Sequence, residues 1–529
     1  MTNSKTNKIK KSVTAAIAFS VITGAAVGCV VTGYKYLCAT AIGLSQTCYD
    51  AMRQKLWIVP IALVCAYLFS WILSVVYKRL PSAMGGGIPT SVAVLRGRIP
   101  FKWFANFISV FTLSIAGFIT GVPLGNEGPC VQMGTALGRG SVKLLDKSKK
   151  ALDRYIMTAG ACAGFAAATG APVSGILFAI EEAHHKISPL LVTVSFVAVS
   201  VCTVTVKLLA PLLGVSPSLF PAFDGATMAL KDLWIPLCVG AVMGICSVGF
   251  LFLYKGVKKI ADKLKIGVQN KIFAAFTLTI AVGLISFSFV STGHEFIKES
   301  LDSSMPWYFL LAALVVRSLL TLFANSTGIT GGIFLPILAV GAAASALVAK
   351  LLVVMGMDSS LALTVQLIGI AACMSGMMKT PIIAVAFGVE ALSLWNNLLG
   401  VTIASGVAYC ITELVGVESV TDAVVEDKIE NINKGKEHIV YEAHAIVGEN
   451  SFAEGKHVRD VLWPPNCFVL SVQKKRRDSE IDEHGDLVLN EGDMLHIRYT
   501  DVEGRDIAKN DILALIGQEH FVSSVEVEI

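Results

Sequence analysis

The sequence has few charged residues for its length. Only 16% of the 529 residues are Asp, Glu, Lys or Arg, whereas 54% are hydrophobic. Soluble domains carry about 25% charged residues, so this composition excludes an ordinary soluble protein and indicates a protein embedded in a lipid bilayer. The formal net charge of +4 is too small to indicate binding of a nucleic acid polymer.

Several chemical signatures are also absent. The 12 cysteines include no pair at metal-ligand spacing, and most lie singly in apolar segments, where they are expected to fill space. A Gly-rich dinucleotide fingerprint is missing, which argues against NAD or ATP as a ligand. Ser174 next to Gly175 could suggest an intramembrane serine protease, but no partner histidine lies in an apolar stretch. We therefore predict no metal, no cofactor and no enzymatic activity.

The sequence does contain a series of long uncharged segments. Each reaches or exceeds the roughly 20 residues that a helix needs to cross about 30 Å of hydrocarbon. These segments are 13–34, 56–77, 103–126, 233–254, 272–293 and 318–349. The first follows several lysines and has no small-residue cleavage site, so it is predicted to be a retained helix with residues 1–12 in the cytoplasm.

Two blocks within this apolar part are repeated. Gly125-Asn126-Glu127-Gly128-Pro129 matches Gly332-Ile333-Phe334-Leu335-Pro336, and a further glycine follows each proline after five residues. A second match lies further along each half. Pro172, Phe178 and Glu181 have the same spacing as Pro381, Phe387 and Glu390. The separations of 207 and 209 residues indicate two homologous halves, predicted at about 13–215 and 230–421. In transporters, duplicated halves usually place the substrate site at their interface.

The first repeated block places a carboxylate at membrane depth. Glu127 lies between uncharged stretches, and the flanking glycines with Pro129 describe a helix that starts inside the protein. The free N–H groups and positive dipole of such a helix start suit an anion. An isolated glutamate would be expected only to cap its own helix. Because the block 332–336 builds a second helix start without a charge, we interpret the two together as an anion site.

A third Gly-rich break followed by proline is Gly85-Gly86-Gly87-Ile88-Pro89. Triple glycine is common in loops, so this motif alone is weak. In their order along the chain, however, the three motifs resemble the GSGIP, GREGP and GxFxP signatures of CLC chloride channels and proton-coupled chloride transporters. The similarity covers roughly residues 15–425 and includes the run 171–182.

This resemblance implies an all-α polytopic membrane domain over residues 13–421, built from two inverted repeats of tilted and broken helices. It also implies a homodimer with one pore per subunit, in the plasma membrane of a bacterial cell, with both termini in the cytoplasm. Glu127 would be the external gate and Glu182 the internal proton-transfer residue. The positions implied to bind the anion are Gly86, Gly87, Ile88, Gly128, Ile333, Phe334 and Thr421.

The sequence departs from the family pattern at three positions. Gly86 stands where the family has a serine, Asn126 stands where it has an arginine, and Thr421 lies near the expected place of a tyrosine. The loss of two side-chain ligands would leave mainly backbone donors around the anion. Each hydrogen bond to a charged group contributes about 1.5–3 kcal/mol, so these departures bear on selectivity and coupling.

Composition changes after Thr412, where charged residues return, and residues 422–437 are predicted to be a linker. From His438 the chain has short β-rich runs separated by Gly, Asp and Pro, as expected for strands of a domain of about 90 residues. The predicted strands are 439–441, 468–472, 487–489 and 494–499.

The C-terminal part, 438–529, resembles the C-terminal subdomain of RCK (TrkA-type) regulators of bacterial potassium transport. The resemblance rests on residues 455–472, with Leu462-Trp463-Pro464, and on residues 485–495, with Glu491-Gly492-Asp493. It implies a small α+β regulatory domain, and some members of that family bind cyclic di-AMP at a dimer interface. Candidate ligand residues are Trp463, Asn466, Lys474 and Arg476. The basic run 474–477 could equally be a solvated hairpin tip or contact lipid head groups.

Three functions stay open at this point. The first is exchange of chloride for protons, gated by Glu127 and regulated through the cytoplasmic domain. The second is a passive anion channel with the same gate, and in either case the anion could also be fluoride or nitrate. The third is a signalling receptor whose ligand-binding domain is its main function. The two glutamates favour exchange, whereas Gly86 and Thr421 favour passive conduction.

Overall fold

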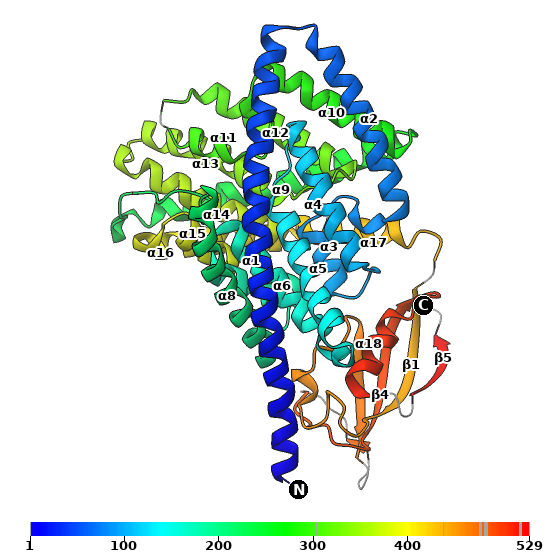
Figure 1. Ribbon diagram of the computed structural model, residues 1–529. Helices are drawn as coiled ribbons and strands as arrows, with labels where there is room; N and C mark the ends of the chain where they lie inside the picture. Colours follow the sequence, from blue (N-terminus) through cyan, green and yellow to red (C-terminus); the bar gives the residue numbers. More distant parts are fainter. Residues whose placement is uncertain are drawn as a thin grey trace.

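The protein consists of a large helical part and a small C-terminal part built on a β-sheet (Figure 1). The computed structural model describes residues 2–302, 304–436, 438–474, 479–480, 485–517 and 521–527. Helix α1 (Thr2–Gln54) runs through the whole height of the helical part, and its N-terminus lies on the same side as the sheet (Figure 1).

Helices of very different lengths make up the helical part. Besides α1, those in segments long and apolar enough to cross a membrane are α2 (Ile58–Arg79), α8 (Pro189–Leu213), α9 (Trp234–Lys263), α10 (Val268–Ile285), α12 (Trp307–Ser326), α13 (Phe334–Val354), α14 (Ala362–Met378) and α16 (Leu398–Val415). The others are α3 (Ile88–Leu95), α4 (Trp103–Ile119), α5 (Glu127–Leu145), α6 (Asp153–Thr169), α7 (Pro172–Phe178), α11 (His294–Ser300), α15 (Pro381–Ala391) and α17 (Val420–Ile432). Short helices in an apolar protein need buried partners for their open ends.

Nine segments of the described chain are long and apolar enough to cross a membrane, which supports a multi-pass membrane protein. Two of the predicted segments are broken at a repeated block, and a third, 272–293, ends as an α-helix at Ile285. The segment 103–126 ends as a helix at Ile119, and 318–349 divides into α12 and α13 around residues 327–333. Both breaks occur at the repeated Gly-rich blocks, which turn the chain before a new helix starts.

The repeated blocks meet in the middle of the molecule. The Gly125 N–H donates to the Gly332 carbonyl at 2.6 Å, and the Gly332 N–H donates back to the Gly125 carbonyl at 2.7 Å. A pair that exchanges both hydrogen bonds in an antiparallel bridge is related by a local two-fold axis. The duplication noticed in the sequence is therefore a two-fold arrangement of the two halves.

The second pair of matched residues obeys the same symmetry. Glu181 accepts hydrogen bonds from the N–H groups of Ile382 and Ile383, at 3.0 and 2.7 Å, at the start of α15. Glu390 accepts from the N–H groups of Val173 and Ser174, at 2.8 and 2.9 Å, at the start of α7. Each half thus supplies a carboxylate that satisfies the open helix end of the other half.

The segment expected to be a linker, 422–437, begins as helix. Helix α17 continues to Ile432 and contacts α3, so the last helix reaches back to the third Gly-rich motif. Ser419 caps this helix, since its hydroxyl accepts the Asp422 N–H at 2.9 Å.

The C-terminal part is a five-stranded antiparallel sheet in the order β3-β2-β4-β1-β5. Its elements are β1 (His438–Ile446), β2 (Cys467–Gln473), β3 (Ser479–Glu480), β4 (Met494–Val502), α18 (Ile507–Ile516) and β5 (Phe521–Val527). Three of the four predicted strand runs fall in β1, β2 and β4. The run 487–489 was wrong as a strand, because only Val488 forms an isolated bridge, with His457. Alternating residues of β1 and β4 pack with α18 into a separate core.

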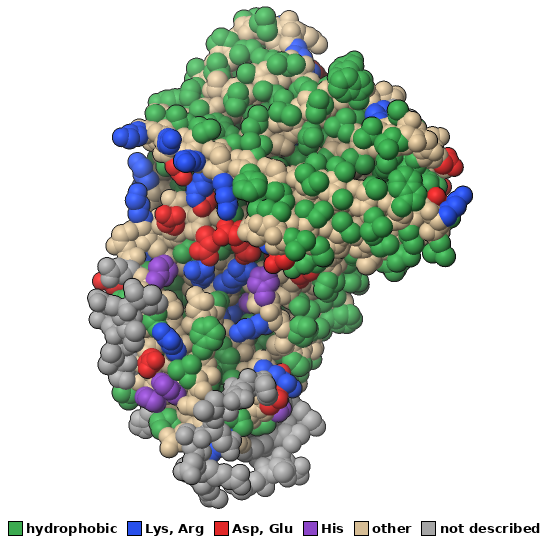
Figure 2. Space-filling model, turned by 180° about the vertical axis from the view of Figure 1, so that it is seen from behind, with side chains coloured by type: hydrophobic (Ala, Val, Ile, Leu, Met, Phe, Trp, Pro, Cys, Tyr) green, Lys and Arg blue, Asp and Glu red, His purple; other side chains and the backbone are tan. Residues whose placement is uncertain are grey.

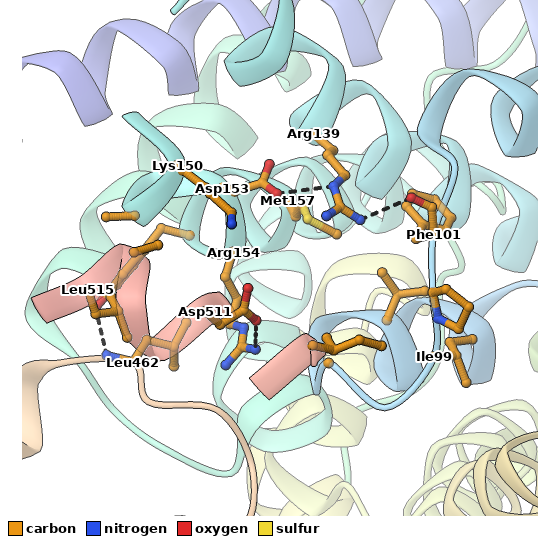
Figure 3. Close-up of a pocket in the computed structure, with 17 residues that line it drawn as sticks. Ile99, Phe101, Arg139, Lys150, Asp153, Arg154, Met157, Leu462, Asp511 and Leu515 are labelled. Atoms are coloured by element: carbon orange, nitrogen blue, oxygen red, sulfur yellow. Dashed lines mark hydrogen bonds and ion pairs between the residues drawn. The ribbon is translucent and has the colours of Figure 1, made fainter. Parts of the chain in front are cut away.

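The sheet domain is docked on the helical part by a few polar contacts. The Tyr155 hydroxyl of α6 accepts the Leu462 N–H at 2.8 Å, and Arg154 pairs with Asp511 of α18 at 2.5 Å. These contacts border a cavity of about 220 Å³ between the two parts, where Arg139 also pairs with Asp153 at 3.1 Å (Figure 3). Figure 2 shows a mostly hydrophobic surface on the helical part and a gathering of charged side chains where it meets the C-terminal part.

One lysine of the sheet domain has no hydrogen-bond partner. Lys456 Nζ is enclosed and lies 2.8 Å from the centroid of the Phe452 ring. Burial lowers the pKa of Lys456 from 10.5 to about 7, because the charged form loses its hydration. Between these two values the unfolded chain binds more protons than the folded domain, so the stability of the domain rises with pH over that window.

We predict that Lys456→Met slows hydrogen exchange in β1 and β4 of the full-length protein at pH 7. Exchange rates corrected for the intrinsic pH effect should show the wild-type domain gaining stability from pH 7 to pH 9, and the variant should lose most of that dependence. Lys474→Met is the matched control, because Lys474 pairs with the buried Asp493 at 2.8 Å and its removal should destabilise the domain. Equal effects of both substitutions would contradict the assignment.

Candidate anion pathway

Three helices start close together in the interior. Helix α3 begins after Gly87, α5 after Asn126 and α13 after Ile333, and the side chains of these preceding residues form no cap. Helix starts without side-chain caps present free N–H groups and a positive end of the helix dipole. Since all three motifs predicted from the sequence supply one such start, the structure brings together the predicted anion-binding residues of these motifs.

The approach of these starts depends on three glycines in mutual contact. A Cβ atom on Gly128 would lie 2.7 Å from the Cα of Gly332 and 2.8 Å from the Cα of Gly87. Real Cβ atoms do not come this close to backbone atoms, so any larger residue would separate the helix starts. Gly87 also has φ +87°, which side-chain-bearing residues rarely adopt.

Gly86 stands where the family has a serine, and its backbone conformation and neighbours would not accept a serine without adjustment. Its φ is +151°, and an added Cβ would lie 3.3 Å from Oε1 of Gln132. Gln132 Oε1 accepts the Gly87 N–H at 2.9 Å, and its amide group donates to the Ser82 carbonyl at 3.1 Å. Sequence reasoning missed Gln132, because a lone glutamine in an apolar helix carries no distinguishing pattern.

Glu127 is completely buried at the first position of α5. Neither of its carboxylate oxygens has a hydrogen-bond partner within the described chain. The side chain folds back over its own turn, so that Oε2 lies 2.5 Å from where a Cβ on Gly125 would stand. A buried ionised carboxylate without partners is costly, and such a group is expected to exchange a proton or to move.

The two-fold counterpart of Glu127 is Phe334, which opens α13. Its ring lies edge-on to Phe165 at 5.3 Å and to Phe387 at 5.6 Å between ring centroids. Phe165 in turn stacks on Phe178 at 5.8 Å, so the matched pair Phe178 and Phe387 belongs to one aromatic cluster. The pathway therefore has a carboxylate on one helix start and an aromatic wall on the other.

Glu182 lies in a short π-helical turn after α7, over residues Ala179–His184. Its side chain is buried, Oε1 has no partner in the described chain, and the Thr421 hydroxyl donates to the carboxylate. Arg96, at the end of α3, donates to the Glu182 carbonyl at 3.0 Å and pairs with Asp422 at 2.9 Å. Thr421 therefore contacts the predicted proton-transfer residue.

A lysine that the sequence did not single out also reaches this region. Lys428 of α17 donates to the Thr90 hydroxyl, and its Nζ lies 3.4 Å from where a Cβ on Gly85 would stand. The sequence analysis placed it in the predicted linker 422–437. Only the return of α17 against α3 brings its ammonium to the third Gly-rich motif.

The candidate ligand residues of the C-terminal domain lie in different surroundings. Trp463 is buried in the domain core, where its indole N–H donates to the Val458 carbonyl at 2.9 Å. Lys474 is neutralised by Asp493. Asn466 borders a small cavity next to Arg96 and Arg98, and Arg476 lies outside the described residues. No group of His, Cys, Asp and Glu able to hold a metal occurs among the residues that the structure covers.

Fold and site together define a multi-pass membrane protein of the anion-transporting class, with buried helix starts from two symmetric halves around a glutamate. A family model described as voltage gated chloride channel matches residues 67–413. The chain belongs to this family, the CLC anion transport proteins.

Solved structures agree with this fold. A slow cyanobacterial Cl⁻/H⁺ antiporter matches with TM-score 0.72 and 20% identity, over 79% of this chain and 99% of the other. A eukaryotic CLC transporter has TM-score 0.64 and 15% identity, covering 78% and 74%. A CLC-type fluoride/proton antiporter has TM-score 0.62 and 19% identity, covering 76% and 96%.

We predict that Gly128→Ala lowers the melting temperature of the detergent-solubilised protein by several degrees and abolishes most anion flux, because the new Cβ meets backbone atoms on two other helices. Gly249→Ala in α9 is the matched control, since nothing lies within 4 Å of an added Cβ there. That change should leave flux intact and keep or slightly raise stability. If both variants melted and transported alike, the close approach at Gly128 would not be required.

Proposed function

We propose that the protein exchanges chloride for protons across the membrane, with Glu127 as the gate and proton acceptor. The observation that supports this most directly is the Glu127 carboxylate itself, buried at a helix start with both oxygens unpaired. A protonated Glu127 is neutral and leaves the helix start to the anion, whereas an ionised Glu127 competes with the anion for the same N–H groups. One group can therefore couple the two movements.

Glu182 is proposed as the internal proton station. Its surroundings suit the role. One carboxylate oxygen has no partner among the described residues, and the hydrogen bond from Thr421 orients the carboxylate. The Arg96–Asp422 pair beside it holds the end of α3 and the start of α17 together, which keeps Glu182 enclosed.

Passive anion conduction is the second candidate. It is favoured by Gly86, which offers no hydroxyl to the anion, and by Thr421, whose hydroxyl is engaged with Glu182. Fluoride and nitrate are alternatives to chloride. Reversal potentials of proteoliposomes under imposed chloride and pH gradients distinguish the two functions. A potential that follows chloride alone would exclude exchange, and repetition with fluoride or nitrate would identify the anion.

For the C-terminal domain we propose a regulatory role in a homodimer, with cyclic di-AMP as the candidate ligand. The docking of α18 through Arg154 and Asp511 supports the regulatory role, because it connects the domain to the helical part (Figure 3). Calorimetric titration of the full-length protein with cyclic di-AMP tests the ligand. If micromolar cyclic di-AMP produced no heat of binding and left the anion flux unchanged, cyclic di-AMP would be excluded as the ligand.

Glu127→Gln should abolish proton movement while anion flux persists or rises, because the neutral amide resembles the protonated gate. The measurement is parallel recording of chloride efflux and proton uptake in proteoliposomes. Glu430→Gln, at an exposed position of α17, is the control and should change neither flux. A complete stop of anion flux in Glu127→Gln would contradict the gate assignment.

For Glu182→Gln the expected result differs, since anions should still pass while the number of protons moved per anion falls at least severalfold. The amide keeps the size of the side chain and its contact with Thr421 but cannot carry a proton. The ratio follows from reversal potentials at several pH gradients. An unchanged ratio would show that Glu182 has only a structural role.

A further inference from the structure

A cavity of about 590 Å³ reaches the residues next to two of the helix starts. Helix α11, which lines it, lies on the side of the helical part away from the β-sheet domain (Figure 1). The walls of the cavity come from the second half of α1, from the segment 214–219 and from the segment 287–299. At its inner end lie Asn126 and Leu335, one from each repeated block. The cavity therefore connects solvent on that side with the residues that precede α5 and begin α13.

The acidic side chains on the cavity wall have hydrogen-bond or ion-pair partners. Glu295 accepts from Lys298 at 3.2 Å and faces Nδ1 of His294 at 3.1 Å, and Glu299 accepts the Ser288 hydroxyl at 2.9 Å. His294 Nε2 faces the Leu219 carbonyl at 2.7 Å. The two acidic residues of α11 that line the cavity thus already have partners, and they would repel an incoming anion unless a cation balanced them.

Lys35 is the one lysine or arginine among the described residues that line the cavity. Among the described residues, the polar contacts of its Nζ are with the carbonyls of Ala167 and Pro217, both at 3.4 Å, which is long for a hydrogen bond. An ammonium group has three donors, so at least one N–H is left to point into the cavity. A half-buried cation with weak backbone contacts is suited to hold a small anion.

Lys35 also lies close enough to Glu127 for the two charges to interact. The first repeated block itself has no cation, because Asn126 is neutral. The positive charge at this entrance therefore comes from α1, a helix that contributes to none of the three motifs.

We propose that Lys35 forms an outer binding site for small monovalent anions such as chloride in this cavity and delivers them to the helix starts behind Asn126 and Glu127. The inference rests on the proposed anion transport. Lys35 supplies the positive charge in a cavity whose other charged wall residues, Glu295 and Glu299, are acidic, and charges that attract a counter-ion can raise association rates tenfold or more. Charge, rather than shape, is the property of Lys35 that matters.

The test is a charge series at position 35 in the full-length protein, reconstituted in liposomes. Initial chloride flux is measured against chloride concentration on the side that faces the cavity. Lys35→Gln should raise the half-saturating chloride concentration about tenfold, Lys35→Glu should raise it further, and Lys35→Arg should keep the wild-type value. Lys298→Gln is the control, because this lysine is outside the cavity lining and already pairs with Glu295.

An ionic-strength series separates charge from structure. Added impermeant salt should raise the half-saturating concentration of the wild type, because screening weakens the attraction, and should have little effect on Lys35→Gln. If Lys35→Gln and Lys35→Glu had the flux, half-saturating chloride concentration and salt dependence of the wild type, the role of Lys35 would be overturned while the proposed anion transport would stand. A wild-type protein that moves no anion would overturn the proposed function and this inference with it.

Discussion

The structure depends on the direct contact of backbones at Gly87, Gly128 and Gly332. Three helices begin in an interior without bulk water, where each unpaired N–H group costs free energy. Their approach lets the donors converge on one place, so that a single anion or carboxylate can satisfy several of them. The Gly125–Gly332 bridge, with bonds of 2.6 and 2.7 Å, holds the two halves in the register that this contact requires.

Four glutamates at the repeated blocks and beside them divide into two kinds. Glu181 and Glu390 each accept two backbone N–H bonds across the two-fold axis, and these bonds explain why both halves have retained a carboxylate at the same place. Glu127 and Glu182 have unpaired oxygens. Satisfied carboxylates hold the frame, and unsatisfied ones are available for protons. The symmetry is broken at the first helix position, since Phe334 occupies the place that corresponds to Glu127.

The C-terminal domain contacts the chain just after α3. Asp511 and Ile507 of α18 lie beside Gly97, in the turn that follows α3, and Arg154 of α6 contacts the same turn. Helix α3 carries the third helix start at its other end, only two turns away. A shift of α18 would therefore act on α3, a short helix whose other end is the third helix start.

The sequence by itself determined the membrane class, the duplication and the three helix starts, because glycine, proline and the lack of charge act locally and leave a readable pattern. It also indicated Glu127 and Glu182. The tertiary structure decided which polar groups lie beside the motifs and the glutamates: Gln132 at Gly87, Thr421 at Glu182, Lys428 at Gly85 and Lys35 near Glu127. These partners come from helices distant in sequence, and a polar side chain in an apolar helix looks the same in sequence whether it meets solvent or a site. Contact across the fold is a matter of helix packing, which no local pattern encodes.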